Sequence, residues 1–236
     1  MQRLMGLIRK ASEEYGLLED GDRIAVGVSG GKDSVAMLYA LNFMRRYLEQ
    51  DYSLVAVTLD MDFPGSRMDF SLIRDLCADM GVEYHVKKTE IGRIIFSERE
   101  EQNPCSLCAR MRRGSLHDAA KEYGCGKVAL GHHRDDAVET FFMNLFIEGR
   151  IGCFQPKTYL SRKDLTLIRP MCLATEAEVA HAARSLHLPV VKSSCPVDGH
   201  TTRQQMKEFI KKMEHDSPGF EKRVFGALCR SGIDGW

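Results

Sequence analysis

The chain has 236 residues, and its 33 lysine and arginine residues balance its 33 aspartate and glutamate residues. A formal net charge of zero excludes a global field that would attract a nucleic acid or an anionic membrane, so a polyanionic partner must be bound by a local basic patch. The length suits one α/β domain with a small helical appendage, and no apolar run approaches the ~20 residues that a membrane span needs.

The first predicted element is Met1–Gly16, an amphipathic segment of mixed charge without a long apolar core or a small-residue cleavage site. We interpret it as the first helix of a cytoplasmic protein. The eight cysteines of the chain are then expected to be reduced thiols or metal ligands, because disulfide frameworks are typical of secreted chains.

The next stretch, Arg23–Leu38, predicts a strand, a tight loop and a helix. An apolar run ends in Ser29-Gly30-Gly31-Lys32-Asp33-Ser34, and the acidic Asp33 is expected to cap a helix with apolar residues at helical spacing. The two glycines let a ligand approach the backbone, and the amides of a first helical turn attract an anion. The loop is therefore predicted to hold a phosphate, although it matches neither the Walker A nor the GxGxxG pattern. A plain glycine turn is the alternative.

Strands and helices alternate after this loop. Ser53–Asp60 and Val82–Val86 are predicted strands, and Met68–Met80 is the helix between them. Asp60 ends its strand at the edge where a doubly wound sheet binds ligands, so it is expected either near the adenosine of a nucleotide or as a turn cap. This alternation of strands and helices predicts a Rossmann-like α/β fold: a doubly wound parallel sheet, helices on both faces and a C-terminal helical segment.

A pair of cysteines follows at a predicted helix start, in Pro104-Cys105-Ser106-Leu107-Cys108. Two cysteines at this spacing can bind one metal ion or cluster, form a redox dithiol, or be unrelated thiols. The arginines behind them are expected near the same end of the helix: Arg110, Arg112 and Arg113.

Lys127–Leu130 is a fourth predicted strand that runs into Gly131-His132-His133-Arg134-Asp135-Asp136 and a helix. The histidines and aspartates lie at the same sheet edge as the phosphate-binding loop. They could be metal ligands, acid–base groups or a well-capped helix start, and the residues alone favour the cap.

The remaining elements are less specific. We expect Phe141–Ile147 to be buried on all sides, Gly149–Leu160 to be a loop, Leu165–Met171 to be a strand, and Glu176–Leu186 to be a helix capped by Thr175. From Thr201 the chain is helical and basic, which predicts either a patch for a nucleic-acid backbone or a solvated surface: Arg203, Lys207, Lys211, Lys212, Lys222 and Arg223.

The loop string resembles the SGGxDS signature of the PP-loop ATP pyrophosphatases. The resemblance implies that the loop binds the pyrophosphate part of ATP with Mg²⁺ and that the enzyme activates an acceptor as an adenylate. The ATP contacts that we expect are Ser29, Gly30, Gly31, Asp33, Ser34, Asp60, Gly131 and His132.

The cysteine segments resemble one branch of that superfamily, the TtcA-like iron–sulfur-dependent tRNA thiolation enzymes (tRNA 2-thiocytidine synthetases). In that family a CxxC and one distant cysteine hold a [4Fe–4S] cluster, and the matching residues here are Cys105, Cys108 and Cys195. Three ligands leave one iron able to bind an external sulfide. The implied reaction adenylates C2 of a pyrimidine in tRNA, with an anticodon-loop cytidine as the expected target, and replaces its oxygen with sulfur.

The resemblance also implies roles for the charged residues of the two motifs. Arg112 is expected to stabilise developing negative charge, and Asp135 or Asp136 to position Mg²⁺ or to move a proton. The implied partners are tRNA and a sulfur donor, either sulfide or a cysteine desulfurase system, together with a second copy in a homodimer; no membrane is involved. Residues 1–22 would be an N-terminal helix, residues 23–200 the PP-loop domain with the cluster, and residues 201–236 a basic helical segment.

The match to the TtcA-like family is incomplete. In that family the distant cysteine lies in a Cys-x-x-Cys-Gly context, whereas this chain has Ser194-Cys195-Pro196. The modified nucleotide therefore stays open, and two alternatives remain. The first is a cluster-independent adenylating enzyme, similar to tRNA lysidine synthetase or to a persulfide-dependent thiouridylase with Cys105 or Cys195 as nucleophile. The second is a nucleotide-binding module with zinc.

Overall fold

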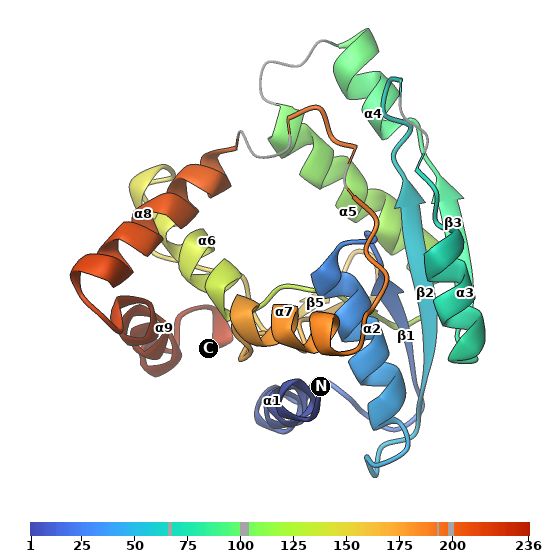
Figure 1. Ribbon diagram of the computed structural model, residues 1–236, viewed down its shortest axis with the longest axis horizontal. Helices are drawn as coiled ribbons and strands as arrows, with labels where there is room; N and C mark the ends of the chain where they lie inside the picture. The colour runs from blue at the N-terminus through green and yellow to red at the C-terminus, as the bar shows by residue number, and fades with distance from the viewer. Residues whose placement is uncertain (66–67, 100–103, 193, 198–200) are drawn as a thin grey trace.

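The computed structural model describes residues 1–65, 68–99, 104–192, 194–197 and 201–236 (Figure 1). The expected domain boundary at residue 200 lies outside these residues. In the described part of the chain, six strands form one sheet in the order β3-β2-β1-β4-β6-β5. They are β1 (Asp22–Gly27), β2 (Tyr52–Asp60), β3 (Glu83–Lys88), β4 (Lys127–Ala129), β5 (Lys157–Leu160) and β6 (Leu165–Ile168).

Helices lie on both faces of this sheet (Figure 1). They are α1 (Gln2–Tyr15), α2 (Lys32–Met44), α3 (Ser71–Asp79), α4 (Ile91–Arg93), α5 (Pro104–Glu122), α6 (Arg134–Phe146), α7 (Glu176–Ser185), α8 (Thr202–Asp216) and α9 (Phe220–Ser231). A π-helical turn at Ile94–Glu98 extends α4, and a 3₁₀ turn at Ile233–Gly235 follows α9. The predicted Rossmann-like fold class is confirmed.

The central strands are buried on both faces, as their continuous apolar sequence predicts. Val26 of β1 and Ala56 of β2 belong to the core under α1, α2 and α7, whereas the alternate residues Ala25 and Val55 pack in a second core with Ala119 of α5. The result is a three-layer arrangement in which the sheet is the middle layer. None of the described helices is both long enough and apolar enough to cross a membrane.

The last sheet edge differs from the prediction. Residues 157–160 form β5, which pairs antiparallel with β6, although Gly149–Leu160 was expected to be a loop. The remaining neighbours in the sheet are parallel. A strand of four residues at the sheet edge carries too little apolar periodicity to be recognised from sequence.

A third apolar layer joins α6 to the C-terminal helices. Val138 and Phe142 of α6 pack against Met206 and Ile210 of α8. The expectation that Phe141–Ile147 is buried on all sides was wrong at its end, because Phe146 is 57% and Ile147 53% exposed. The side of α6 that meets α8 and α9 is covered, and an all-apolar segment does not reveal which side that is.

The strand order brings the predicted site to one edge. β1 lies beside β4, with Val26 opposite Ala129, and β4 lies beside β6, with Ala129 opposite Ile168. Because these strands are parallel, the loops that follow them meet at the carboxyl edge of the sheet. The strand order reverses at β1, which is where doubly wound sheets bind their ligands.

A close backbone contact at this edge gives a stability prediction. Gly92 of α4 donates its amide to the Met61 carbonyl, and a Cβ on Gly92 would lie 2.7 Å from that oxygen and 2.8 Å from the Asp62 carbonyl oxygen. We expect Gly92→Ala to lower the free energy of unfolding by about 1–3 kcal/mol, because two backbone oxygens would have to move. Denaturant unfolding measures the change.

Gly6→Ala in α1 is the matched control, since no atom lies within 4 Å of its Cβ position. This change should leave stability unchanged or raise it by up to about 1 kcal/mol through helix propensity. Equal stabilities of the two variants would contradict the packing that we describe around Gly92.

Candidate functional site

The phosphate loop, which we define as Ser29–Ser34, is closed by its two serines. The Ser29 amide donates to Ser34 Oγ at 3.1 Å, and Ser34 Oγ donates to the Gly31 carbonyl at 2.9 Å. The Gly31 amide donates to Ser29 Oγ at 3.3 Å. These bonds fix the curvature of the loop at the carboxyl end of β1, where the sequence predicts it.

Helix α2 starts from this loop without a side-chain cap. Gly31 occupies the N-cap position in an extended conformation, and no side chain accepts a hydrogen bond there. The expectation that Asp33 caps the helix was therefore wrong: Asp33 lies in the first turn, and its carboxylate pairs with Lys32 at 3.1 Å. An uncapped first turn leaves its amides to an anion, as a phosphate site requires.

Gly30 is required by both its backbone conformation and its neighbour. Its φ is +85°, and a Cβ there would lie 2.9 Å from the Cβ of Val191. The segment behind α7 crosses the loop at this point, because the Val191 amide donates to the Gly30 carbonyl at 2.9 Å. A second close approach joins the loop after β4, since a Cβ on Gly131 would lie 3.3 Å from the Ser34 amide nitrogen.

A Lys–Glu–Lys bridge connects the phosphate loop to the C-terminal helices. Glu176, at the start of α7, pairs with Lys32 Nζ at 3.1 Å through one oxygen and with Lys207 Nζ of α8 at 2.5 Å through the other. Burial alone would raise the pKa of Glu176, but the two ammonium groups outweigh it and lower the pKa to about 2. For Lys32 the signs are opposite: burial lowers the pKa of the ammonium group, but the carboxylates of Asp33 and Glu176 outweigh burial, so the pKa of Lys32 is raised.

The Gly131–Asp136 motif starts helix α6 with a capping box. His133 is the N-cap: its Nδ1 accepts from the Asp136 amide at 3.4 Å, and Asp136 Oδ2 accepts from the His133 amide at 2.9 Å. The helix-cap interpretation, which the residues alone favour, is thus confirmed for His133 and Asp136.

The two aspartates of this motif differ in their partners. Asp136 Oδ1 accepts a hydrogen bond from Arg203 of α8 at 3.0 Å, so both of its oxygens are bonded. Asp135 Oδ2 accepts from the Glu176 amide at 2.9 Å and caps the start of α7. In the described part of the chain, no hydrogen bond to Asp135 Oδ1 is formed, so Asp135 retains an oxygen for a ligand.

The basic residues of the C-terminal helices fall into two groups, those in ion pairs with carboxylates and those exposed to solvent. Arg203 also bonds Glu139 at 3.2 Å, and burial together with the neighbouring Asp136 raises the pKa of Glu139. Arg203 and Lys207 therefore pair with carboxylates at this sheet edge, and their contact with a nucleic-acid backbone stays a prediction. Lys211 and Lys212 of α8 are exposed, as are Lys222 and Arg223 of α9.

His132 lies in an aromatic and cationic environment at the end of β4. Its ring stacks on Phe154 with 5.1 Å between ring centroids, and its Nδ1 is 3.3 Å from Arg169 Nε. Arg169 follows β6 directly and is 8% exposed. Arg169 was not among the predicted site residues, and the one sequence signal was its position inside the predicted strand Leu165–Met171, where a charged residue is unexpected.

Asp60 acts as a turn cap in the structure. Its Oδ1 accepts from the Asp62 amide at 3.3 Å, and its carbonyl accepts from the Thr89 amide and hydroxyl at 2.9 and 2.8 Å. The turn-cap alternative is confirmed, whereas a contact with adenosine stays a prediction.

The three predicted cluster thiols approach one another at the same sheet edge. Cys105 and Cys108 lie in the first turns of α5, and Cys195 lies in the segment that runs from α7 towards that end of α5 (Figure 1). Cys108 and Cys195 both pack on an apolar cluster formed by Met61, Phe63, Ile91 and Ile95. Burial and then the neighbouring Cys195 thiol raise the pKa of Cys105.

Arg112 lies one helical turn behind Cys108. Burial raises the pKa of the Cys108 thiol, and the Arg112 guanidinium opposes this by favouring the thiolate. Among the described residues, no group of three or more His, Cys, Asp or Glu side chains is arranged to hold a metal ion. The other cysteines are buried or half-buried thiols: Cys77, Cys125, Cys153, Cys172 and Cys229.

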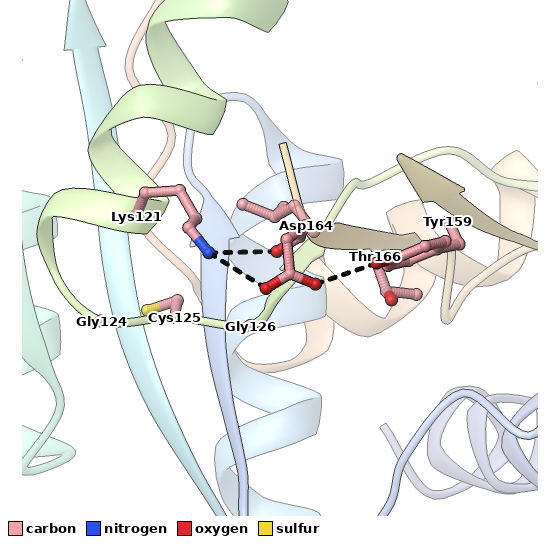
Figure 2. A pocket seen from close by; sticks show the side chains of 8 residues that line it. Lys121, Gly124, Cys125, Gly126, Tyr159, Asp164 and Thr166 are labelled. Carbon is pink, nitrogen blue, oxygen red and sulfur yellow. Dashed lines mark hydrogen bonds and ion pairs between the residues drawn. The ribbon is translucent and has the colours of Figure 1, made fainter. Parts of the chain in front are cut away.

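A pocket of about 260 Å³ lies elsewhere, at the amino ends of β4 and β6 (Figure 2). Its polar side chains satisfy one another: Lys121 Nζ donates to the Asp164 carbonyl at 3.1 Å, and the Tyr159 hydroxyl donates to Asp164 Oδ1 at 3.0 Å. It contains none of the predicted site residues, which lie at the opposite edge of the sheet.

Comparison with known proteins agrees with this geometry. The family model of the PP-loop domain matches residues 4–214. A tRNA-cytidine(32) 2-sulfurtransferase of Citrifermentans bemidjiense is 39% identical over 229 residues, which covers 96% of this chain and 89% of that protein. The enzyme of the same name from Geobacter sulfurreducens is 39% identical over 233 residues, with the same coverage of 96% and 89%.

Among solved structures, the U34-tRNA thiolase NcsA from Methanococcus maripaludis, determined with its [4Fe-4S] cluster, is similar with a TM-score of 0.78. It is 27% identical in sequence, and the match covers 96% of this chain and 77% of that chain.

A parallel sheet whose central strand runs into an SGGKDS loop at the switch point defines the class of PP-loop proteins. Within that class, the chain belongs to the family of the tRNA-cytidine(32) 2-sulfurtransferases. The resemblance that the sequence motifs indicate is thereby confirmed.

The phosphate loop gives a prediction with a neighbouring control. We expect Gly30→Ala to lower the free energy of unfolding by about 1–3 kcal/mol, because a side chain there meets both an unfavourable φ and Val191. Gly31→Ala should change it by less than about 0.5 kcal/mol, since its Cβ would lie at an ordinary 3.5 Å from Ser29 Oγ. Urea unfolding compares the two, and a Gly30→Ala variant as stable as Gly31→Ala would refute the crossing by Val191.

The Lys–Glu–Lys bridge gives a pH-dependent prediction. The folded pKa of Glu176 is about 2, below its ordinary value of 4.5, so the ionised group stabilises the fold fully above about pH 4.5. This stabilisation is lost as the pH falls from 4.5 towards 2. We therefore expect Glu176→Gln to be less stable than the parent by a constant amount from pH 7 to pH 5, and the difference to shrink below that range.

Denaturant unfolding at a series of pH values measures this difference. Lys207→Met removes one of the two ammonium groups, so the same Glu176→Gln change in that background should cost less. A difference that is unaffected by pH would mean that Glu176 stabilises the fold by packing and not by its charge.

Proposed function

We propose that the protein is an ATP-dependent tRNA sulfurtransferase that replaces the C2 oxygen of an anticodon-loop cytidine, at position 32, with sulfur. The observation that carries the proposal is the shared sheet edge: an uncapped phosphate loop and three converging thiols lie there, in a chain 39% identical to tRNA-cytidine(32) 2-sulfurtransferases over nearly its full length. The names of these relatives give cytidine as the target and so support cytidine as the substrate here. The more distant NcsA is named for uridine 34 instead.

The thiols fit a [4Fe–4S] cluster better than a zinc ion. Iron–sulfur clusters take cysteine thiolates as ligands and are larger than one ion, which suits Cys108 and Cys195 on one apolar surface with Cys105 near Cys195. Arg112 supplies positive charge that favours the thiolate form of Cys108. Cys105, Cys108 and Cys195 would hold such a cluster, and with three protein ligands it would supply one iron open to an external sulfide.

The phosphate loop supports the activation step. In this proposal the C2 oxygen of the cytidine attacks the α-phosphate of ATP, and pyrophosphate leaves while bound by the loop amides and the start of α2. Sulfur then forms a bond to C2, the C2–O bond breaks, and AMP leaves. The loop residues Ser29, Gly30, Gly31, Asp33 and Ser34 are the proposed pyrophosphate contacts, with Gly131 packed against Ser34.

The two aspartates receive different roles. Asp136 is a positioning residue, because both of its oxygens are used by the helix cap and by Arg203. Asp135 is the proposed Mg²⁺ or proton-transfer group, because its Oδ1 is not engaged by the described residues and its Oδ2 is fixed by the start of α7. Mg²⁺ prefers carboxylate and phosphate oxygens, which Asp135 and ATP provide.

The macromolecular partners follow from the same proposal. The exposed basic residues of the C-terminal helices are proposed contacts for the tRNA backbone: Lys211, Lys212, Lys222 and Arg223. Sulfide or a cysteine desulfurase system as the donor, a homodimer, a cytoplasmic location and the three domain boundaries stay predictions.

The decisive experiment combines cluster analysis with a thiolation assay. Protein purified without oxygen should contain close to four irons and four acid-labile sulfides per chain and absorb broadly near ~400 nm. With ATP, Mg²⁺, sulfide and unmodified tRNA, we expect 2-thiocytidine at position 32 by nucleoside mass spectrometry.

The triple variant Cys105→Ala, Cys108→Ala and Cys195→Ala should lose both the iron and the product, whereas Cys229→Ala should keep both. Thiolation that persists without iron would support the persulfide alternative. A colourless protein that contains zinc and forms no product would support the nucleotide-binding module and overturn the proposal. A 2-thiouridine product would support the proposed thiolation reaction but would show that the substrate is a uridine and not cytidine 32.

A further inference from the structure

Arg169 is a buried cation that the proposed reaction does not use. It follows β6, and the neighbouring parallel strand β4 leads to His132, so the sheet register brings the two residues side by side. The Leu130 amide donates to the Ile168 carbonyl at 3.0 Å and continues the strand pairing into this region. Burying an arginine side chain costs free energy unless its N–H groups form hydrogen bonds, so the contacts of Arg169 indicate why it is buried.

The guanidinium is held in one orientation. It lies over the Phe154 ring at 4.8 Å from the centroid, and its Nη1 donates to the Gln155 carbonyl. Phe154 is itself fixed by Trp236, whose indole Nε1 donates to the Phe154 carbonyl at 2.7 Å. With Nη1 committed to Gln155, Nε points at His132 Nδ1 at 3.3 Å.

This contact determines where His132 carries its proton. Every nitrogen of a guanidinium donates and none accepts, so His132 Nδ1 has to be the acceptor. A neutral imidazole has one N–H, which must then be on Nε2. Burial lowers the pKa of Arg169 to about 10, which still leaves it charged at neutral pH.

The surroundings of His132 keep the ring neutral. Burial lowers the pKa of His132 to about 4; Asp136 opposes the shift, and Arg169, Arg203 and His133 add to it. Among the described residues, no hydrogen bond is formed by Nε2. Gly131 lies against the first turn of α2 at Ser34, so His132 is one residue along the chain from a contact with the phosphate loop.

We propose that Arg169 is a positioning residue that holds His132 as its Nε2–H tautomer, so that His132 donates a hydrogen bond to an oxygen of ATP at the phosphate loop. His132 then serves as a fixed donor and not as a base, and proton transfer falls to another group such as Asp135. The inference rests on the proposed function only in taking ATP as the ligand.

The tautomer is tested directly by NMR of the full-length protein with ¹⁵N-labelled histidine. Loss of one ring signal in His132→Gln assigns His132 among the eight histidines. We expect a protonated Nε2 and an unprotonated Nδ1 from pH 5.5 to pH 8. A protonated Nδ1 in the parent would overturn the proposal without any reference to thiolation.

The donor role is tested by two substitutions that differ in reach. The amide nitrogen of glutamine can occupy the place of imidazole Nε2, whereas that of asparagine reaches only the place of Nδ1. In calorimetric titrations with ATP and Mg²⁺, we expect His132→Gln to bind within about threefold of the parent and His132→Asn to bind about tenfold or more weakly. Equal affinities of the two variants would overturn the donor role.

Arg169→Met completes the test, because it removes the N–H that fixes the ring. It should shift the His132 proton towards a mixture of both tautomers, raise the pKa of His132 and weaken ATP binding, whereas a purely structural role would leave the tautomer unchanged. If Arg169→Met does not fold, the parent spectrum and the two His132 variants still decide the question. A parent protein that binds no ATP would refute the proposed function, and the NMR result would stand apart from it.

Discussion

The site depends on the contact of three loop backbones at the carboxyl edge of a parallel sheet. The loops after β1 and β4 meet where Gly131 touches Ser34, and the segment behind α7 crosses Gly30 at Val191. Parallel pairing of β1, β4 and β6 forces these loops to the same edge, and glycine is the residue that lets their backbones touch. The phosphate loop, the capped start of α6 and the thiols all take their positions from this edge.

Charge at this edge is balanced from a distant part of the chain. Asp136 and Glu139 share Arg203, and Glu176 shares Lys32 and Lys207, so two of the three basic groups come from α8. Apolar packing of Met206 and Ile210 on α6 holds α8 in place for these ion pairs. Helix α8 therefore supplies charge to the sheet edge that carries the phosphate loop, a role that its basic sequence alone does not indicate.

The sequence predicted what local patterns encode. The buried strands, the phosphate loop and the Thr175 cap of α7 follow from short-range residue order, and the structure contains them. Contacts between elements were out of reach: Arg203 bonds Asp136, which lies 67 residues away, and nothing in the sequence around Arg169 indicates its contact with His132. The edge strand β5 was missed because four residues carry little periodicity.

The separation of the thiols along the chain has a consequence for biosynthesis. Cys105 and Cys108 leave the ribosome early, but Cys195 comes to them only after β4, α6, β6 and α7 have been made and packed. The cluster that we propose for these cysteines would therefore be completed only once the sheet has brought the two segments together, so its assembly would depend on the folded domain and not on the CxxC segment alone.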